Sequence, residues 1–289
     1  MSPTGPNYQW RIGPETKVRL GPERPWVMGI LNVTPDSFSD GGRYYDLDAA
    51  VRHGIQLAED GADVIDVGGE STRPQAEPVP EDEEIRRVVP VIETLSREVS
   101  IPISVDTMKP RVAARAIEKG ACIVNDVGAN RASNEMWRLV ADAQVGYVLM
   151  HMQGAPQTMQ SHPDYENVVD AVFQFFTHRR DRFLECGGAP EQLVFDVGIG
   201  FGKSVEHNLT LLRATETFTQ LQRPMLLGVS RKSFIGKLLG LDPGERTIPS
   251  IVCGLMAVER GASILRVHDV RAHAQALRMR SHWSPTGPD

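Results

Sequence analysis

Short apolar segments alternate with longer amphipathic segments along this chain, and that alternation restricts its fold more than any other feature. Each apolar segment is rich in aliphatic or β-branched residues and ends at polar residues or glycine, as expected for strands of a βα repeat. Eight strands are predicted, over residues 26–31, 64–67, 103–105, 123–124, 147–150, 194–195, 226–229 and 264–267.

Helices are predicted between and after these strands. Pro110 suits the first turn of a helix, and acidic residues follow Pro80, which are both helix-start signals. The expected helices cover residues 48–59, 81–98, 110–119, 135–143, 165–186, 205–222, 249–260 and 271–280.

Eight consecutive βα units with right-handed crossovers close most economically into a (β/α)₈ TIM barrel, an α/β fold. The alternative is a doubly wound open sheet, which normally has a glycine-rich turn after its first strand. Here residues 32–36 read Asn-Val-Thr-Pro-Asp instead, which favours the barrel.

The ends of the chain differ from the repeat. Residues 8–20 alternate around Gly13 and Pro14, which predicts a β-hairpin placed to cover the barrel floor. We therefore expect an N-terminal tail and hairpin over residues 1–24, one catalytic barrel over 25–280 and a C-terminal tail over 281–289.

Composition excludes several classes of protein. Hydrophobic residues make up 41% and charged residues 24% of the 289, as in an ordinary globular chain. The net charge of -6, without a Lys/Arg run, argues against nucleic acid and membrane partners. No signal-peptide pattern is present, so a cytoplasmic location is predicted. The three cysteines lack CxxC spacing, which argues against disulfides or a zinc site.

Polar residues follow every predicted strand, and TIM barrels carry their sites at these carboxyl ends. One such aspartate is more often a helix cap, but eight polar strand ends meeting at one mouth indicate a site. Asp106, Asn125 and Asp196 supply hydrogen-bond acceptors there, whereas Lys232 and Arg266 supply cations.

This mixture suits a ligand with two faces. A carboxylate matches the paired N–H groups of a planar, amidine-like heterocycle, and a phosphate would lie beside Arg266 and His268. A pterin that carries a phosphate ester meets both requirements.

Other chemistries fit less well. A metal hydrolase would need clustered ligands, yet only His151 and His268 among eight histidines follow strands. The glycine-rich residues 198–204 miss both nucleotide-loop patterns by one residue, so we expect their glycines to admit a flat ligand, with Phe201 as a stacking face. Lys232 lies among polar neighbours, which favours anion binding over Schiff-base chemistry.

Longer motifs carry a family resemblance. Residues 28–42 (MGILNVTPDSFSDGG) and 66–74 (DVGGESTRP) resemble the paired signatures of the dihydropteroate synthase family, which binds pterins in a TIM barrel. The similarity continues in order through residues 104–107, 124–126, 150–152, 196–203, 230–234 and 266–269.

The resemblance implies an enzyme of folate biosynthesis and a target of sulfonamides. Members of this family join 6-hydroxymethyl-7,8-dihydropterin diphosphate to 4-aminobenzoate, releasing diphosphate and 7,8-dihydropteroate, with Mg²⁺ as cofactor. Pterin contacts are implied for Asp106, Asn125, Met150, Asp196, Gly228 and Lys232. Contacts with 4-aminobenzoate are implied for Thr72, Arg73, Pro74, Phe201 and Ser233.

The remaining roles concern the leaving group. The resemblance assigns diphosphate binding to Asn32, Arg266 and His268, and Mg²⁺ binding to Asn32. Catalytic roles fall to Asp106, Lys232, Arg266 and His268.

Two further expectations concern movement and assembly. Gly41–Gly42 and Gly68–Gly69 flank long strand-end loops, so these loops, with Phe38 and Asp40, are expected to close and exclude water; static connections are the alternative.

Residues 250–258 are apolar on more than one helix face, which predicts a homodimer, as the resemblance also does.

Two other functions remain open at this point. One is a pterin-binding methyltransferase that serves a corrinoid protein, and the other is a non-catalytic pterin-binding paralogue. The first has no need for residues 34–42 or for Ser-Arg-Lys-Ser at 230–233, and the second would be expected to lack diphosphate or aminobenzoate residues.

Overall fold

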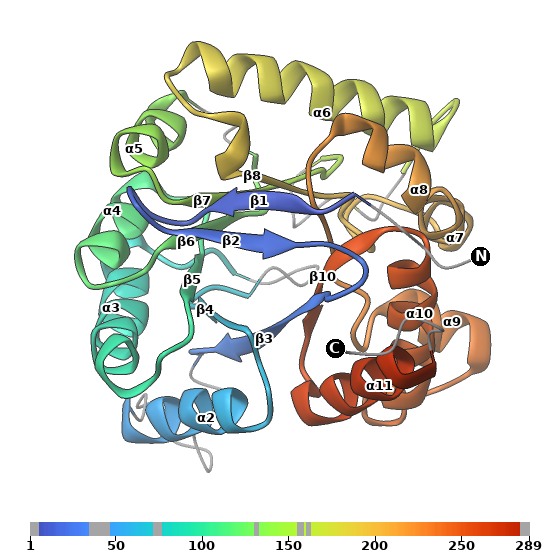
Figure 1. The fold of residues 1–289 in the computed structure, drawn as a ribbon, viewed down its shortest axis with the longest axis horizontal. Coiled ribbons are helices and arrows are strands. Elements are labelled where there is room, and N and C mark those ends of the chain that lie inside the picture. The colour runs from blue at the N-terminus through green and yellow to red at the C-terminus, as the bar shows by residue number, and fades with distance from the viewer. Residues whose placement is uncertain are drawn as a thin grey trace.

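A computed structural model describes residues 6–34, 47–71, 77–129, 133–154, 159 and 163–283. In this part of the chain, eight parallel strands form a closed barrel surrounded by helices (Figure 1). The barrel strands are β3 (Trp26–Asn32), β4 (Val64–Gly68), β5 (Ile103–Asp106), β6 (Ile123–Asp126), β7 (Gly146–Met150), β8 (Leu193–Asp196), β9 (Met225–Leu227) and β10 (Ala262–Val267). β10 pairs with both β9 and β3, which closes the barrel and confirms the predicted TIM-barrel fold.

The helices form the outer layer. They are α2 (Leu47–Glu59), α3 (Glu81–Glu98), α4 (Pro110–Glu118), α5 (Glu135–Ala143), α6 (Val168–Glu185), α7 (Val205–Arg213), α8 (Thr215–Phe218), α9 (Ser233–Leu239), α10 (Thr247–Glu259) and α11 (Val270–Trp283). Short 3₁₀ helices are η1 (Pro190–Gln192), η2 (Thr219–Leu221) and η3 (Pro243–Glu245). None of the helices described is long and apolar enough to span a bilayer.

Local sequence explains where three of the described helices begin. Pro110 is at the first turn of α4, as predicted. Asn167 caps α6 by accepting hydrogen bonds from two backbone N–H groups, and Ser204 caps α7 by accepting from the N–H of His207.

The helices differ from the prediction in two places. The expected helix over 205–222 is interrupted at Ala214, where Thr215 Oγ1 donates to the carbonyl of Leu212 at 2.9 Å and competes with the helical pattern. Helix α9 was not predicted, because the polar residues at 230–233 were interpreted only as a strand-end loop.

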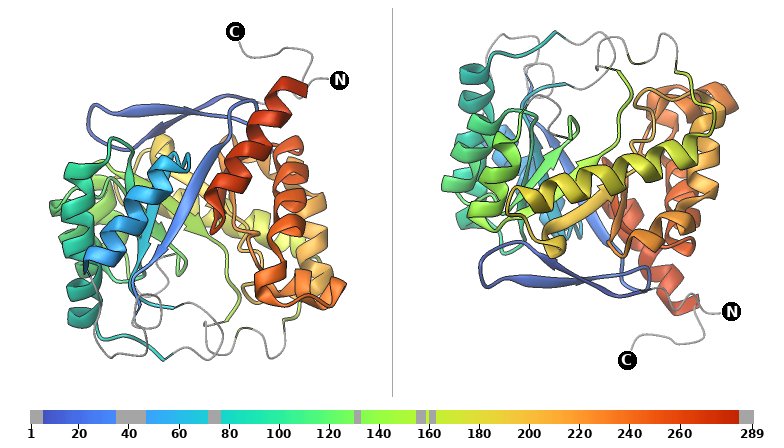
Figure 2. Two further views of the ribbon diagram at one scale, coloured as in Figure 1. Left: turned by 90° about the horizontal axis from the view of Figure 1, so that it is seen from below. Right: turned by 90° about the horizontal axis from the view of Figure 1, so that it is seen from above.

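The N-terminal hairpin, β1 (Tyr8–Arg11) with β2 (Lys17–Leu20), lies across one end of the barrel (Figure 2). Trp10 donates from Nε1 to the carbonyl of Gln192 at 2.8 Å. A Cβ at Gly146 would lie 2.9 Å from the Trp10 ring, so this ring is packed against strand backbone. The hairpin residues share an apolar cluster with Met28, Val64, Ile123, Val148, Val194, Leu226 and Ile264. The prediction that the hairpin covers the barrel floor is confirmed.

Strand periodicity places a polar layer above this apolar floor. Side chains two residues apart on a strand share a face, so each residue two positions beyond a floor residue also points into the barrel. These residues include Asp66, Asn125, Met150, Asp196, Gly228 and Arg266. The sequence pattern thus collects polar groups at the carboxyl end of the barrel.

Candidate active site

Arg266, from β10, is held between two carboxylates at the centre of the polar layer. Its Nε lies 2.6 Å from Asp66 Oδ2, and its Nη2 lies 2.6 Å from Asp106 Oδ2. Asp66 is fully buried, and the Arg266 side chain is 20% exposed. Within the described residues, Nη1 has no recorded hydrogen-bond partner, so it is available to an anion.

Asp66 also binds Asn125, a residue of the predicted pterin pocket. The Asn125 Nδ2 group donates to Asp66 Oδ2 at 2.9 Å. Asp66 begins the motif at residues 66–74, but the motif alone does not indicate a role for it. An acidic residue at an inward position of the apolar strand Val-Ile-Asp-Val-Gly was the signal that could have identified it.

These contacts explain the electrostatics of the group. Burial raises the pKa of Asp106 to about 7, and the attraction of Arg266 offsets only part of that increase. Burial lowers the pKa of Arg266, but the charges of Asp66 and Asp106 have the larger combined effect and raise it above its ordinary value. Arg266 is therefore a permanent cation, whereas Asp106 titrates near neutrality.

A second group consists of Asp196, Lys232 and Phe201. Asp196 ends β8 and is 5% exposed; its Oδ1 accepts from the N–H of Gly198 at 2.8 Å. The Lys232 ammonium lies 4.2 Å from the centre of the Phe201 ring, within cation–π range. Burial lowers the pKa of Lys232 to about 8, opposed by the negative charge of Asp196. Burial raises the pKa of Asp196 despite the hydrogen bond from Gly198.

Lys232 follows a tight turn after β9, and its neighbour Arg231 lies in that turn. Arg231 has a φ angle of 56°, and its Nε donates to Asp269 Oδ2 at 3.0 Å. The Arg231 side chain therefore has a structural role. Ser230 Oγ accepts from the backbone N–H of His268 at 3.1 Å and lies 3.0 Å from its Nδ1. Burial, with the charge of Arg266, lowers the pKa of His268 to about 4, so its ring is neutral at pH 7.

The other described site residues lie on neighbouring strands. Met150 is buried and pairs in register with Asp196. A Cβ at Gly228 would meet nothing within 4 Å, so this position borders open space. Asn32, half-buried at the end of β3, pairs with Gly68.

The comparisons with known proteins agree with this arrangement. The family model described as "Pterin binding enzyme" matches residues 28–268. Dihydropteroate synthase of Escherichia coli K12 is 46% identical over 257 residues, which cover 88% of this chain and 90% of that protein. The chain belongs to the dihydropteroate synthase family.

Solved structures of family members lead to the same conclusion. Dihydropteroate synthase of Xanthomonas albilineans with 4-aminobenzoic acid has a TM-score of 0.89 and 44% identity, covering 98% of this chain and 100% of that one. The same bacterium's synthase in complex with 7,8-dihydropteroate has a TM-score of 0.84 and 43% identity, covering 93% and 97%.

In this dihydropteroate synthase family member, not every strand-end residue belongs to the site. Asp126 accepts from the Tyr147 hydroxyl at 2.6 Å and from the N–H of Gly128 at 2.7 Å. The same hydroxyl accepts from Trp137 of α5 at 3.1 Å, which links Asp126 to the helix layer. Ser233 remains a predicted aminobenzoate residue and is exposed at the start of α9. Five predicted residues lie outside the described part of the chain: Phe38, Asp40, Thr72, Arg73 and Pro74.

Glycines 198 and 202 serve contacts between loops. Their φ angles are 67° and 63°, and a Cβ would lie 2.0 Å from the carbonyl oxygen of His151 or 2.4 Å from that of Gln153. The loops after β7 and β8 thus pack backbone to backbone. Ligand approach, the reason inferred from sequence, is not required to explain these two positions.

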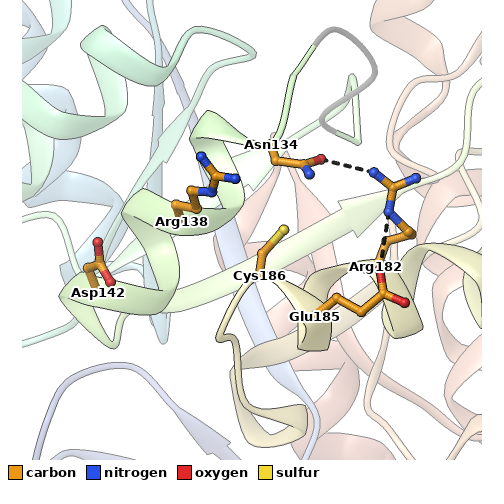
Figure 3. Close-up of a pocket in the computed structure, with 6 residues that line it drawn as sticks. All are labelled: Asn134, Arg138, Asp142, Arg182, Glu185 and Cys186. Carbon is orange, nitrogen blue, oxygen red and sulfur yellow. Dashed lines mark hydrogen bonds and ion pairs between the residues drawn. The ribbon is translucent and has the colours of Figure 1, made fainter.

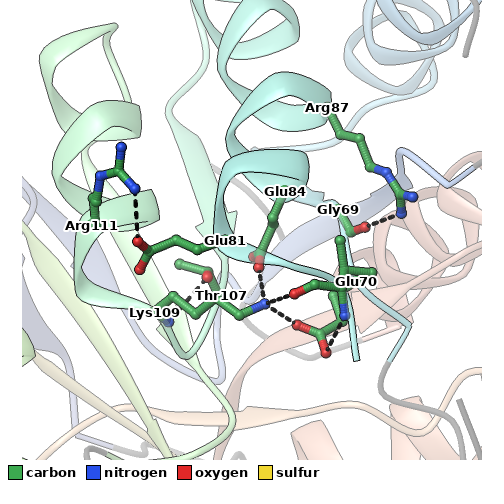
Figure 4. A network of polar contacts seen from close by, with 9 residues as sticks. Gly69, Glu70, Glu81, Glu84, Arg87, Thr107, Lys109 and Arg111 are labelled. Carbon is green, nitrogen blue, oxygen red and sulfur yellow. Dashed lines mark hydrogen bonds and ion pairs between the residues drawn. The ribbon is translucent and has the colours of Figure 1, made fainter. Parts of the chain in front are cut away.

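Lys109 links the connection between β4 and α3 to the start of α4 (Figure 4). Its Nζ lies 2.5 Å from Glu70 Oε2, 2.5 Å from Glu84 Oε2 and 2.8 Å from the carbonyl oxygen of Val79. Glu70 also accepts from the N–H of Val79 at 3.3 Å. Both ends of this connection are therefore tied together, which sequence reasoning did not foresee.

Two grooves lie between helices of the outer layer. One, of about 600 Å³, lies between α5 and α6, where Arg182 contacts Asn134 and Glu185 (Figure 3). The other, of about 730 Å³, is lined by residues of α4 and α5. No cluster of three potential His, Cys, Asp or Glu metal ligands occurs among the described residues.

Proposed function

We propose that the barrel mouth binds 6-hydroxymethyl-7,8-dihydropterin diphosphate and 4-aminobenzoate and condenses them to 7,8-dihydropteroate. The observation that carries this proposal is the position of Arg266, held by Asp66 and Asp106 and within electrostatic reach of the buried Asp196 and the half-buried Lys232. Carboxylates suit the N–H groups of a pterin, and the free edge of the guanidinium suits a diphosphate. The ligands named for the Xanthomonas structures support the same substrates.

The pterin ring is assigned to the inward polar layer. Asp196 would accept from paired N–H groups, Asn125 would contribute a second hydrogen bond, and Lys232 would donate to a ring acceptor. Met150 would pack on the ring, and the open space beside Gly228 leaves room for it.

Diphosphate departure is assigned to Arg266 and His268. Arg266 would meet the charge that develops on the leaving oxygen, and neutral His268 would donate a hydrogen bond. Loss of diphosphate leaves a cation on the exocyclic methylene, conjugated with the dihydropterin ring. Asp106, ionised above a pKa of about 7, would stabilise that cation.

Mg²⁺ is compatible with the residues present. It prefers oxygen ligands, keeps several waters and commonly takes phosphate oxygens, so a site needs few protein ligands. The half-buried Asn32 can supply one amide oxygen at the mouth, whereas Asp66 and Asp106 are engaged by Arg266. The ion would neutralise charge on the diphosphate when bound.

The aminobenzoate end is assigned to Phe201, Ser233 and residues 72–74. The arylamine is neutral at pH 7 and needs orientation more than a base, which a stacking face on Phe201 would provide. Phe38 and Asp40 would belong to a loop that closes and excludes water. Sulfonamides would compete at this end as analogues of 4-aminobenzoate.

A homodimer is proposed through α9, α10 and α11. Large apolar side chains are exposed there, including Ile248 at 74%. The others are Leu238, Leu239, Val252, Met256, Met279 and Trp283. Such a concentration on adjacent helices is typical of a protein interface. A cytoplasmic location remains a prediction from sequence.

The direct test supplies pterin diphosphate, 4-aminobenzoate and Mg²⁺ to the purified chain and measures dihydropteroate and diphosphate. Equal amounts of both products are expected. Pterin binding without either product would indicate the non-catalytic paralogue, and methyl transfer to a corrinoid protein would indicate the methyltransferase. Either result would contradict the proposed reaction.

A further inference from the structure

Asp66 lies directly beneath the proposed pterin site and contacts two of its residues through one oxygen. Oδ2 accepts from Arg266 Nε at 2.6 Å and from Asn125 Nδ2 at 2.9 Å. The side chain points into the barrel from β4 and is fully buried. It therefore cannot reach a ligand at the mouth except through these two neighbours.

The contact with Arg266 determines the direction of the hydrogen bond between Asp66 and Asn125. Oδ2 lies against the Nε–H group of Arg266, which can only donate, so this oxygen acts as a hydrogen-bond acceptor. Asn125 must then turn its NH₂ group toward Asp66, because the opposite amide orientation would place two acceptors together. Oδ1 of Asn125 consequently faces away from Asp66, and it accepts no recorded hydrogen bond from the described residues.

If Asp66 served packing alone, a carboxylate at this position would lower the stability of the fold. Its Oδ1 is buried and has no hydrogen-bond partner within the described part of the chain. An unsatisfied buried oxygen lowers stability, and an apolar side chain of similar size often replaces a buried ion pair without loss. The carboxylate is better explained by what it imposes on Asn125 and Arg266.

We infer that Asp66 is a positioning residue that sets the hydrogen-bond polarity of the pterin site. It holds Asn125 so that the ligand meets an acceptor, and it holds Arg266 by Nε so that Nη1 remains for an anion. The inference rests on the proposed function, which places a pterin against Asn125. The site therefore favours a ligand that presents an N–H group to the Asn125 side chain over a ligand that presents a hydrogen-bond acceptor there.

A double-mutant cycle tests the inference with 6-hydroxymethylpterin, which lacks phosphate and so minimises the contribution of Arg266. The variants are Asp66→Asn, Asn125→Ala and the double variant. Asp66→Asn should weaken pterin binding about ten-fold or more when Asn125 is present, and less than about two-fold when position 125 is alanine. Calorimetric titration gives each affinity.

Asp63→Asn is the matched control. Asp63 precedes β4 at the opposite end of the barrel, where it accepts from the N–H of Val27 at 2.8 Å. The same chemical change there should leave pterin affinity within about two-fold. Equal losses from Asp66→Asn in both backgrounds would overturn the inference. Unchanged affinity in Asn125→Ala would overturn both the inference and the pterin assignment of Asn125.

A measurement on the unmodified protein covers the case in which Asp66→Asn does not fold. With ¹⁵N-labelled asparagine, the Asn125 side-chain NH₂ resonances should be protected from solvent exchange both with and without pterin. Direct engagement of those NH₂ protons by the pterin, seen as a bond-specific coupling or contact to the ligand, would contradict the inference.

Discussion

The Lys232 ammonium lies 4.2 Å from the centre of the Phe201 ring, which joins a residue assigned to the pterin with one assigned to 4-aminobenzoate. Because Gly200 is also close, with a Cβ there 3.3 Å from Lys232 Cδ, the lysine stem has little freedom. The two proposed substrate positions would thus share one restrained side chain.

The pH profile of kcat/KM for the pterin diphosphate should be bell-shaped. Activity should rise through about pH 7 as Asp106 ionises, and fall above about pH 8 as Lys232 loses its proton. Lys232→Arg keeps the cation but titrates far above this range, so its alkaline limb should disappear. An unchanged alkaline limb in that variant would assign it to another group.

Stability should also depend on Asp106. Its pKa rises from ~3.9 in the unfolded chain to about 7 when folded, so its contribution is fully present below about pH 4 and is lost as the pH rises through 7. Urea unfolding should therefore show a decrease in unfolding free energy over this range from Asp106. Asp106→Asn should show a smaller decrease. If the unfolding free energy of the variant depended on pH as steeply as that of the unmodified protein, the raised pKa of Asp106 would be contradicted.

Pterin capture should depend on Asp196. Asp196→Asn presents one mismatched donor to the ligand, and disrupting a buried charged hydrogen-bond pair costs ~2–5 kcal/mol of binding free energy. Calorimetry should therefore show little pterin binding. Asp126→Asn is the control, because that buried strand-end carboxylate contacts Tyr147 and Gly128. Similar losses in both variants would mean that the substitution acts through folding.

Diphosphate departure should depend on Arg266. Arg266→Ala should slow single-turnover formation of product by ~10²–10³, as for other groups that stabilise developing charge. It should also lower stability by ~3–5 kcal/mol, because Asp66 would remain buried without its cation. Arg223→Ala removes a buried arginine at the barrel floor, where it donates to the carbonyl of Leu193, and should affect stability alone. A similar rate loss in Arg223→Ala would remove the special role of Arg266.

The proposed dimer should depend on α10. Ile248→Asp and Val252→Asp place charges among exposed apolar side chains and should give 31.9 kDa species in sedimentation at micromolar concentration. Gln56→Asp, on the exposed face of α2, should leave the dimer intact. A monomeric unmodified protein would contradict the proposal.

Strand positions and strand-end residues were predictable because the barrel strands are buried on both faces, so that each appears as a short continuous apolar run followed by polar residues. Asp196 and Arg266 could be selected from sequence since each ends or follows a buried segment. The roles of Asp66, Ser230 and Arg231 could not, because they depend on partners from strands or helices remote in sequence, such as Asp269 for Arg231. Helix α9 was missed for a local reason: its start overlaps a motif that also carries site residues.

The order of bond breaking is the central chemical claim, and isotope exchange within the substrate tests it most directly. Pterin diphosphate carrying ¹⁸O at the bridge to the methylene would be incubated with enzyme and Mg²⁺ but without 4-aminobenzoate. If diphosphate leaves before the arylamine attacks, label should move from the bridge to non-bridging positions in recovered substrate, and Arg266→Ala should suppress that movement. Label that stays in the bridge, in enzyme that turns over normally once 4-aminobenzoate is added, would contradict the account.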